Sequence, residues 1–243
     1  LRPGLGRVLG AAQVRHQADE LGAGALVDAG DHLGGVGHLR HRARADGVVS
    51  ERRDLDVIAD LVPAGSRVLD LGCGDGQLLA HLVQHKGCSG YGVEIDDAKL
   101  RAAMARGIDV LQLNLEEGLA MFGDASFDVV LQLDTLQHLR NAEKMLIETA
   151  RVGRIGIVSF PNFAHWPNRL SVARGRMPVT KTLPYQWYDT PNIRVGTYAD
   201  FEVLARKNGL SILDSFGLRE GRPVRWWPNA RAAVAVFKFA RQI

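Results

Sequence analysis

The sequence is poor in cysteine and in long apolar runs, and each shortage excludes a class of protein. Cys73 and Cys88 are the only cysteines among 243 residues, and no Cys-x-x-Cys or Cys/His cluster occurs. Neither a disulfide framework nor a zinc site is supported. No apolar run approaches the roughly 18 residues that a membrane helix needs, and the first residues lack the apolar block of a secretory signal. We therefore expect a cytoplasmic protein without a membrane anchor.

The first fifty residues lack a further set of residue types: Phe, Tyr, Trp, Ile, Met, Lys, Asn and Thr. Phe, Tyr, Met, Ile, Asn and Lys together number 38 in the other 193 residues, so proportional use would place about ten of them here. Because these six types use AT-rich codons, we hypothesise that the segment is GC-rich upstream DNA translated from a misassigned start, with Val48 or Val49 as the true first residue. Without aromatic side chains, the segment cannot bury enough apolar area to offset the conformational entropy it would lose on ordering. We expect residues 1–50 to be a non-native or disordered extension.

The rest of the chain has an ordinary globular composition but an uneven charge. Hydrophobic residues make up 46% and charged residues 23% of the whole sequence, which is close to the globular average. Residues 51–150 carry 9 Lys/Arg against 17 Asp/Glu, whereas residues 151–243 carry 15 against 5. A basic C-terminal part suits contact with an acidic protein, an anionic ligand or nucleic acid, and it is equally compatible with a solvated surface.

Hydrophobic periodicity predicts an α/β domain over residues 51–243. Short apolar runs alternate with amphipathic segments, a pattern typical of a parallel sheet covered on both faces. The expected strands are residues 67–71, 91–95, 108–113, 127–133, 154–160, 211–216 and 231–239, and the expected helices are 54–62, 77–86, 98–106, 142–152 and 198–208. The short connection before the last strand permits only antiparallel pairing. We therefore predict a Rossmann-like, seven-stranded, mostly parallel sheet with a reversed last strand, interrupted by an irregular aromatic and arginine-rich segment at 161–196.

A glycine-rich turn joins the first expected strand to its helix. The turn reads Asp70-Leu71-Gly72-Cys73-Gly74-Asp75-Gly76. Ligands of open α/β sheets bind at such a strand end, where glycines allow close approach of the backbone. Gln77 occupies the place of the third glycine of a dinucleotide fingerprint, and no Gly-Lys-Ser/Thr follows. Asp70 and Asp75 make the turn anionic, which favours a ligand with a positive centre over a pyrophosphate.

This turn resembles the first motif of class I methyltransferases, whose cofactor S-adenosylmethionine carries a sulfonium and an ammonium group. Glu94 closes the second expected strand 18 residues after Gly76, where a carboxylate can accept hydrogen bonds from ribose hydroxyls. The end of the third strand carries an Asn where such folds usually have an acidic residue. We expect S-adenosylmethionine or S-adenosylhomocysteine to bind at Asp70, Gly72, Gly74, Asp75, Gly76, Glu94, Ile95, Asn114 and Leu115. The alternative is a tight turn without a cofactor.

No catalytic residue can be assigned from the sequence. Cys73 has no His adjacent in sequence and is not expected to be a nucleophile. Asp134 and His138 follow the fourth strand one helical turn apart, so they form either a general-base pair or a helix-capping Asp beside a surface His. No Asp/Asn-Pro-Pro-Tyr/Phe motif occurs there, which argues against nucleic-acid bases and glutamine side chains as acceptors.

The irregular segment has the most distinctive sequence in the chain. Its parts are Ser159-Phe160-Pro161-Asn162-Phe163-Ala164-His165-Trp166, Arg174-Gly175-Arg176-Met177-Pro178-Val179-Thr180 and Leu183-Pro184-Tyr185-Gln186-Trp187-Tyr188-Asp189-Thr190-Pro191-Asn192. Together with the glycine turn and Thr135-Leu136-Gln137, they resemble the MetW family of methionine biosynthesis, from about Asp54 to Leu218. Asn114 and Asp134 differ from the residues usual at these positions. The resemblance implies a methyltransferase-like fold acting with a MetX-like homoserine O-acyltransferase.

Three functions remain open at this point. The first is a cofactor-binding accessory subunit, with the aromatic and arginine-rich segment as its partner surface. The second is an active methyltransferase on a small molecule, with the same segment as a lid. The third, with the least support, is a nucleic-acid methyltransferase, suggested by Arg225-Trp226-Trp227 within the basic C-terminal part. Aromatic side chains packed beneath the segment would leave it without any binding role.

Overall fold

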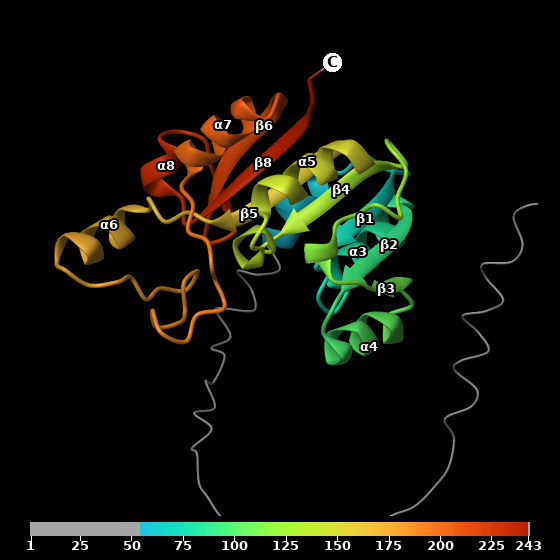
Figure 1. Ribbon diagram of the computed structural model, residues 1–243, viewed down its shortest axis with the longest axis horizontal. Helices are drawn as coiled ribbons and strands as arrows, with labels where there is room; N and C mark the ends of the chain where they lie inside the picture. Colours follow the sequence, from blue (N-terminus) through green and yellow to red (C-terminus); the bar gives the residue numbers. More distant parts are fainter. Residues whose placement is uncertain (1–53, 243) are drawn as a thin grey trace, which may run out of the picture. The chain divides into compact units, whose positions relative to one another are not determined.

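The computed structural model describes residues 54–242, and the expectations for residues 1–50 lie outside this range. The described domain is an eight-stranded sheet with helices on both faces (Figure 1). The strands are β1 Arg67–Leu71, β2 Ser89–Glu94, β3 Val110–Gln112, β4 Phe127–Leu133, β5 Gly153–Pro161, β6 Leu210–Arg219, β7 Arg222–Val224 and β8 Val234–Arg241. The helices are residues 54–60, α3 Gln77–Lys86, α4 Asp97–Ala105, α5 Ala142–Val152, α6 Trp166–Ala173, α7 Tyr198–Lys207 and α8 Pro228–Arg231, with short 3₁₀ turns η1 Leu115–Glu117 and η2 Leu136–His138.

The strand order is β3-β2-β1-β4-β5-β8-β6-β7. β1 to β5 pair in parallel, and β8 runs antiparallel to both of its neighbours, β5 and β6. The predicted α/β class and the reversed last strand are confirmed. Because parallel strands end at one edge, the segments that follow β1, β2, β3 and β4 gather there.

The predicted count of seven strands is wrong, because β7 adds an eighth at the edge of the sheet. β6 and β7 form a hairpin whose two connecting residues, Glu220 and Gly221, have φ of 53° and 74°. Two positive φ values are typical of the tight turns that join antiparallel strands. Pro223 lies in this three-residue strand. A proline in a sequence usually indicates a loop, but an edge strand tolerates it.

Two further expectations need correction in the C-terminal half. Residues 161–196 are not wholly irregular, because α6 begins at Trp166 with Pro167 in its first turn, a position that proline favours. The last strand begins at Val234 rather than Arg231, since α8 occupies Pro228–Arg231. In both places a short helix begins beside a proline that suggests a loop in the sequence.

The core lies on both faces of the sheet. One cluster joins helix 54–60 and α3 to β1 and β4, and includes Ile58, Leu79 and Val129. A second joins α5 and α7 to β5 and β8 through aromatic side chains such as Phe201 and Phe237, whose rings stack 4.4 Å apart. Burial of each such side chain stabilises the fold by about 1.5–3 kcal/mol. Between residues 54 and 242, no helix has both the length and the apolar character needed to cross a membrane.

Candidate cofactor-binding site

Three glycines give the turn after β1 its shape. Gly72, Gly74 and Gly76 have φ of 76°, 58° and 72°, a left-handed conformation that costs other residues about 1–2 kcal/mol. A Cβ on Gly72 would lie 2.5 Å from Thr135 Oγ1, and one on Gly76 would lie 2.9 Å from the Cβ of Ala103. A Cβ on Gly74 would meet nothing within 4 Å. Gly72 and Gly76 are therefore needed for packing, whereas Gly74 turns the chain and leaves open space above the loop.

Thr135 supports this loop from below. Its hydroxyl lies 3.0 Å from the carbonyl oxygen of Leu71 and 2.9 Å from that of Leu133, so it joins the ends of β1 and β4. The residue is buried. Thr135 is not among the cofactor-binding residues predicted from the sequence. The available signal was its position two residues after the predicted end of a strand next to the glycine turn.

Glu94, at the end of β2, contacts the glycine turn, so the two predicted parts of the cofactor site lie together. Its Oε2 accepts a hydrogen bond of 2.9 Å from the backbone N–H of Gly74, and its Oε1 accepts bonds of 2.9 and 3.0 Å from Ile95 and Asp96. The side chain is buried. A carboxylate offers about four acceptor positions, and three are used here. One acceptor position is thus left for a ligand hydroxyl, and a second becomes free if the Gly74 bond is exchanged.

The charge of the glycine turn is smaller than its two aspartates suggest. Asp75 forms a 2.6 Å ion pair with Arg106, which also donates from Nε to the Asp75 carbonyl oxygen at 2.9 Å. Asp70 is buried at the end of β1, and burial, assisted by the nearby charge of Glu94, raises the pKa of its carboxyl from 3.8 to about 7. A cationic group placed beside Asp70 would favour the ionised form. The arrangement therefore suits a ligand that brings a positive charge.

The remaining predicted contact residues lie along the same edge. Glu94 pairs with Gln112 across β2 and β3, so Ile95 and Asn114 follow neighbouring strand ends. Ile95 is 59% exposed, and Leu115 is partly buried. Asn114 Oδ1 caps η1 by accepting a 3.1 Å bond from the Glu116 N–H, and its second lone pair remains for another donor.

Cys73 has no nucleophilic character in this setting. Burial, followed by the charges of Asp70 and Glu94, raises the pKa of its thiol to about 12. The thiol is therefore protonated at neutral pH, whereas the thiolate is the nucleophile. Its role is steric, because the sulfur lies where a Cβ on Gly92 would come within 2.5 Å.

Asp134 and His138 lie beyond the end of β4. Asp134 has a φ of 48°, a conformation that non-glycine residues adopt rarely and often near functional sites. It is accessible to solvent, yet surrounding protein raises the pKa of its carboxyl by desolvation, while His138 acts in the opposite direction. η2 has Thr135 at its N-cap position and no side-chain cap, so the expectation of a capping Asp is wrong.

His138 is exposed, and its Nδ1 lies 3.2 Å from the carbonyl oxygen of Pro191. Within the described residues, no direct hydrogen bond joins it to the carboxyl of Asp134. The imidazole is instead positioned by the loop that returns from α6. A proton on Nδ1 directed at that carbonyl leaves Nε2 as a free acceptor.

Comparisons with known proteins identify the family of the chain. The family model described as "Methionine biosynthesis protein MetW" matches residues 52–239. The chain belongs to the MetW family. A "Bifunctional methionine biosynthesis protein MetXA/MetW" from Rhodopirellula baltica is 38% identical over 203 residues, covering 78% of this chain and 33% of that protein. The chain thus spans about a third of the length of this curated relative.

Two solved structures show the same fold as this MetW-family chain. A possible histamine N-methyltransferase from Thermotoga maritima gives a TM-score of 0.60 at 19% identity, covering 81% of this chain and 91% of that one. Magnesium protoporphyrin IX methyltransferase from Synechocystis, with bound S-adenosylhomocysteine, gives a TM-score of 0.58 at 22% identity, covering 87% of this chain and 90% of that one. The fold is that of class I methyltransferases.

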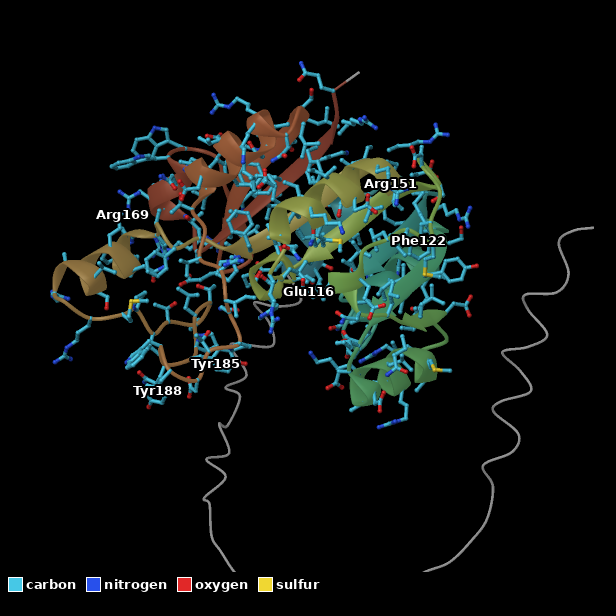
Figure 2. The ribbon with its side chains drawn as sticks, viewed as in Figure 1. Glu116, Phe122, Arg151, Arg169, Tyr185 and Tyr188 are labelled. Atoms are coloured by element: carbon cyan, nitrogen blue, oxygen red, sulfur yellow. The ribbon has the colours of Figure 1, made fainter. Side chains whose placement is uncertain are left out.

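The aromatic and arginine-rich segment of this MetW-family chain extends away from the sheet (Figure 1). Ten of the twenty large apolar side chains that are exposed in the described part of the chain fall within residues 161–196. Trp187 and Tyr188 are 72% and 71% exposed, and Tyr185 and Tyr188 lie on the loop beyond α6 (Figure 2). The alternative in which Trp187 and Tyr188 pack beneath the segment is therefore wrong. Such a concentration of exposed aromatic surface is typical of an interaction site.

Asn162 holds the two ends of this segment together. The residue is fully buried. Its Nδ2 donates to the carbonyl oxygens of Ala232 and Asn229 at 2.9 and 3.0 Å, and its Oδ1 accepts from the N–H groups of Ala164 and Tyr198 at 3.2 and 3.1 Å. One side chain thus connects the departing chain, the start of α7 and the segment after α8. From the sequence, Asn162 stands out only as part of the motif at residues 159–166, and its structural role was not predicted.

Proposed function

We propose that the chain binds S-adenosylmethionine at the glycine turn and supports a homoserine O-acyltransferase in methionine synthesis. The observation that carries cofactor binding is the contact between Gly74 and Glu94, because it sets an open backbone loop beside a buried carboxylate. When bound, the cofactor would supply a cationic sulfonium and a transferable methyl group. Asp70 would bind its positive end, Glu94 its ribose hydroxyls, and Asn114 would accept from the adenine amino group.

Calorimetric titration with S-adenosylmethionine and S-adenosylhomocysteine tests cofactor binding. Glu94→Ala removes a charged acceptor and frees the Gly74 N–H, so we expect affinity to fall by about 1–3 kcal/mol, or roughly 5- to 150-fold. Arg101→Glu, on the exposed face of α4, serves as a charge-changing control and should bind normally. Absence of binding by the wild-type chain at millimolar cofactor would refute the assignment.

The partner role is supported by the family and by the surface of residues 161–196. The Rhodopirellula relative carries the names MetXA and MetW in one bifunctional protein, and joining two modules in one chain keeps them at high effective concentration. In the present chain, Trp187 and Tyr188 supply exposed aromatic anchors. Arg174 and Arg176 are exposed, and in the described residues neither guanidinium forms an ion pair or hydrogen bond. Aromatic residues and arginines are enriched at protein interfaces.

A charge reversal on this surface tests the partner role. The double variant Arg174→Glu/Arg176→Glu should weaken association with the acyltransferase by at least about ten-fold, since like charges replace complementary ones at the contact. Arg101→Glu again provides the control. Acyltransferase rates with and without each chain give the functional readout. Equal co-purification of the double variant and the wild type would contradict the proposal.

Methyl transfer to a small molecule is the second candidate, favoured by the Asp134–His138 region. There a desolvated carboxyl and an imidazole with a free Nε2 lie beyond the end of β4, and such an imidazole can accept a proton from a hydroxyl or amine. Incubation with methyl-labelled S-adenosylmethionine and a small-molecule cell extract should label a product. Label that persists undiminished in His138→Ala, with His85→Ala as the control, would exclude a base role for His138.

A further inference from the structure

An ion pair between Asp75 and Arg106 joins the glycine turn to α4. The guanidinium of Arg106 holds two atoms of Asp75: Nη2 lies 2.6 Å from Oδ2, and Nε donates to the main-chain carbonyl oxygen at 2.9 Å. The second carboxylate oxygen, Oδ1, accepts a 3.3 Å bond from the N–H of Gln77 at the start of α3. A guanidinium presents several N–H groups in a rigid plane, whereas an ammonium acts as a single point charge. The contact is therefore specific to an arginine.

Close packing places Arg106 beside the turn. A Cβ on Gly76 would lie 2.9 Å from the Cβ of Ala103, which is fully buried, so this end of α4 lies directly against the turn. The N–H of Arg106 donates to the carbonyl oxygens of Ala103 and Met104 at the C-cap of the helix. A helix C-terminus favours a positive charge. The position of the guanidinium thus follows from the packing of α4 and needs no bound ligand.

Arg106 offsets one of three negative charges at the turn. Among the described residues, the buried carboxyls of Asp70 and Glu94 form no ion pair, and Asp75 pairs with Arg106. Burial, followed by the charges of the two buried carboxyls, raises the pKa of the Cys73 thiol, and Asp75 adds to this shift. The charge of Asp75 therefore acts across the turn. Because the side chains of Asp75 and Arg106 are 47% and 44% exposed, salt can screen their charges.

We propose that Arg106 determines how strongly the cofactor site distinguishes a cationic ligand from a neutral ligand of nearly the same shape. The inference rests on the proposed function, because S-adenosylmethionine and S-adenosylhomocysteine are such a pair and differ by one methyl group and the sulfonium charge. With Arg106 in place, Asp75 adds little net charge to the turn, and the neutral form retains affinity. Without Arg106, the uncompensated carboxylate favours the cation. The ratio of the two dissociation constants therefore depends on this ion pair.

Calorimetric titration of the full chain with both ligands tests the proposal. At an ionic strength of about 0.02 M the screening length is about 20 Å, so the charges act at nearly full strength. Arg106→Gln should shift the ratio toward S-adenosylmethionine, and Asp75→Asn, which leaves a cation unpaired, should shift it toward S-adenosylhomocysteine. A unit charge roughly 10 Å from another in water changes a binding equilibrium by about two-fold, and each variant should change the ratio by at least this factor. The double variant should restore the wild-type ratio.

Two control variants separate charge from shape. Arg106→Lys keeps the charge but loses one of the two contacts, so both affinities should fall while their ratio stays the same. Arg154→Gln removes an exposed arginine that lies 3.7 Å from Asp128 near the starts of β5 and β4, at the opposite edge of the sheet, and should alter neither affinity. In about 1 M sodium chloride the screening length falls to about 3 Å, and the shifts in the ratio should disappear.

The outcomes distinguish this inference from the proposed function. A wild type that binds neither ligand would refute cofactor binding itself and this inference with it. If the wild type binds both ligands, the inference alone is overturned by an unchanged ratio in Arg106→Gln and Asp75→Asn, by shifts in the same direction, or by shifts that persist at high salt. Thermal unfolding verifies that each variant folds. If one single variant fails to fold, the sign of the shift in the other decides the question.

Discussion

The buried carboxyl of Asp70 should make the fold less stable as pH rises. In the unfolded chain its pKa is near the ordinary 3.8, whereas burial beside Glu94 raises it to about 7 in the fold. Between these values the folded state holds a proton that the unfolded state has lost, so stability falls as pH increases. Each pKa unit corresponds to about 1.4 kcal/mol, and the shift of about three units gives a cost of at most about 4 kcal/mol above pH 7. Asp70→Asn removes this cost, because an amide has no charge to desolvate.

Urea denaturation followed by far-ultraviolet circular dichroism measures the effect. We expect the variant to match the wild type near pH 4 and to exceed its free energy of unfolding increasingly up to about pH 7, with a constant difference beyond. Asp60→Asn, on an exposed helical position, serves as the matched control. The same substitution should weaken S-adenosylmethionine binding, because it removes the partner of the cationic end. A variant no more stable than the wild type at about pH 8 would refute the reasoning.

Two further substitutions separate packing from ligand binding. Gly74→Ala should lower the free energy of unfolding by about 1–2 kcal/mol and abolish cofactor binding in calorimetry, since its methyl group enters the open space above the loop. Gly72→Ala should cost more stability, because its Cβ also meets the hydroxyl of Thr135; equal losses in urea denaturation would contradict this difference. Asn162→Ala should cost about 2–5 kcal/mol by leaving buried partners unpaired, whereas Asn192→Ala, half-buried in the same segment, should stay within about 0.5 kcal/mol.

The parts of the fold that follow from short-range patterns could be predicted from the sequence. β1 and α5 begin and end at the predicted residues, because apolar periodicity and terminal glycines specify them. β7, α6 and α8 could not, since three to eight residues beside a proline carry too little periodicity and are stabilised by tertiary contacts. Pro223, for example, indicates the end of a strand when only the sequence is considered, but it lies in a strand paired to β6.

The candidate site shows the same division between local and long-range information. The positions of Gly74 and Glu94 follow from strand ends, and the structure joins them by a hydrogen bond. The support from Thr135 and the ion pair between Asp75 and Arg106 required knowledge of which distant segments meet. The sequence therefore indicated which residues could hold a cofactor, but it overstated their charge. Burial and pairing, which alter that charge, are properties of the fold.

The hydrogen bonds of Asn162 have a consequence for which changes the segment at residues 161–196 can tolerate. The N–H of Phe163 also donates to the carbonyl oxygen of Gly196 at 2.9 Å. Together with the amide of Asn162, this bond fixes the two ends of the segment that contains α6. Substitutions, insertions or deletions between those points need not disturb the sheet. Side chains on the outer surface of this segment can therefore be replaced without altering the architecture of the domain that supports it.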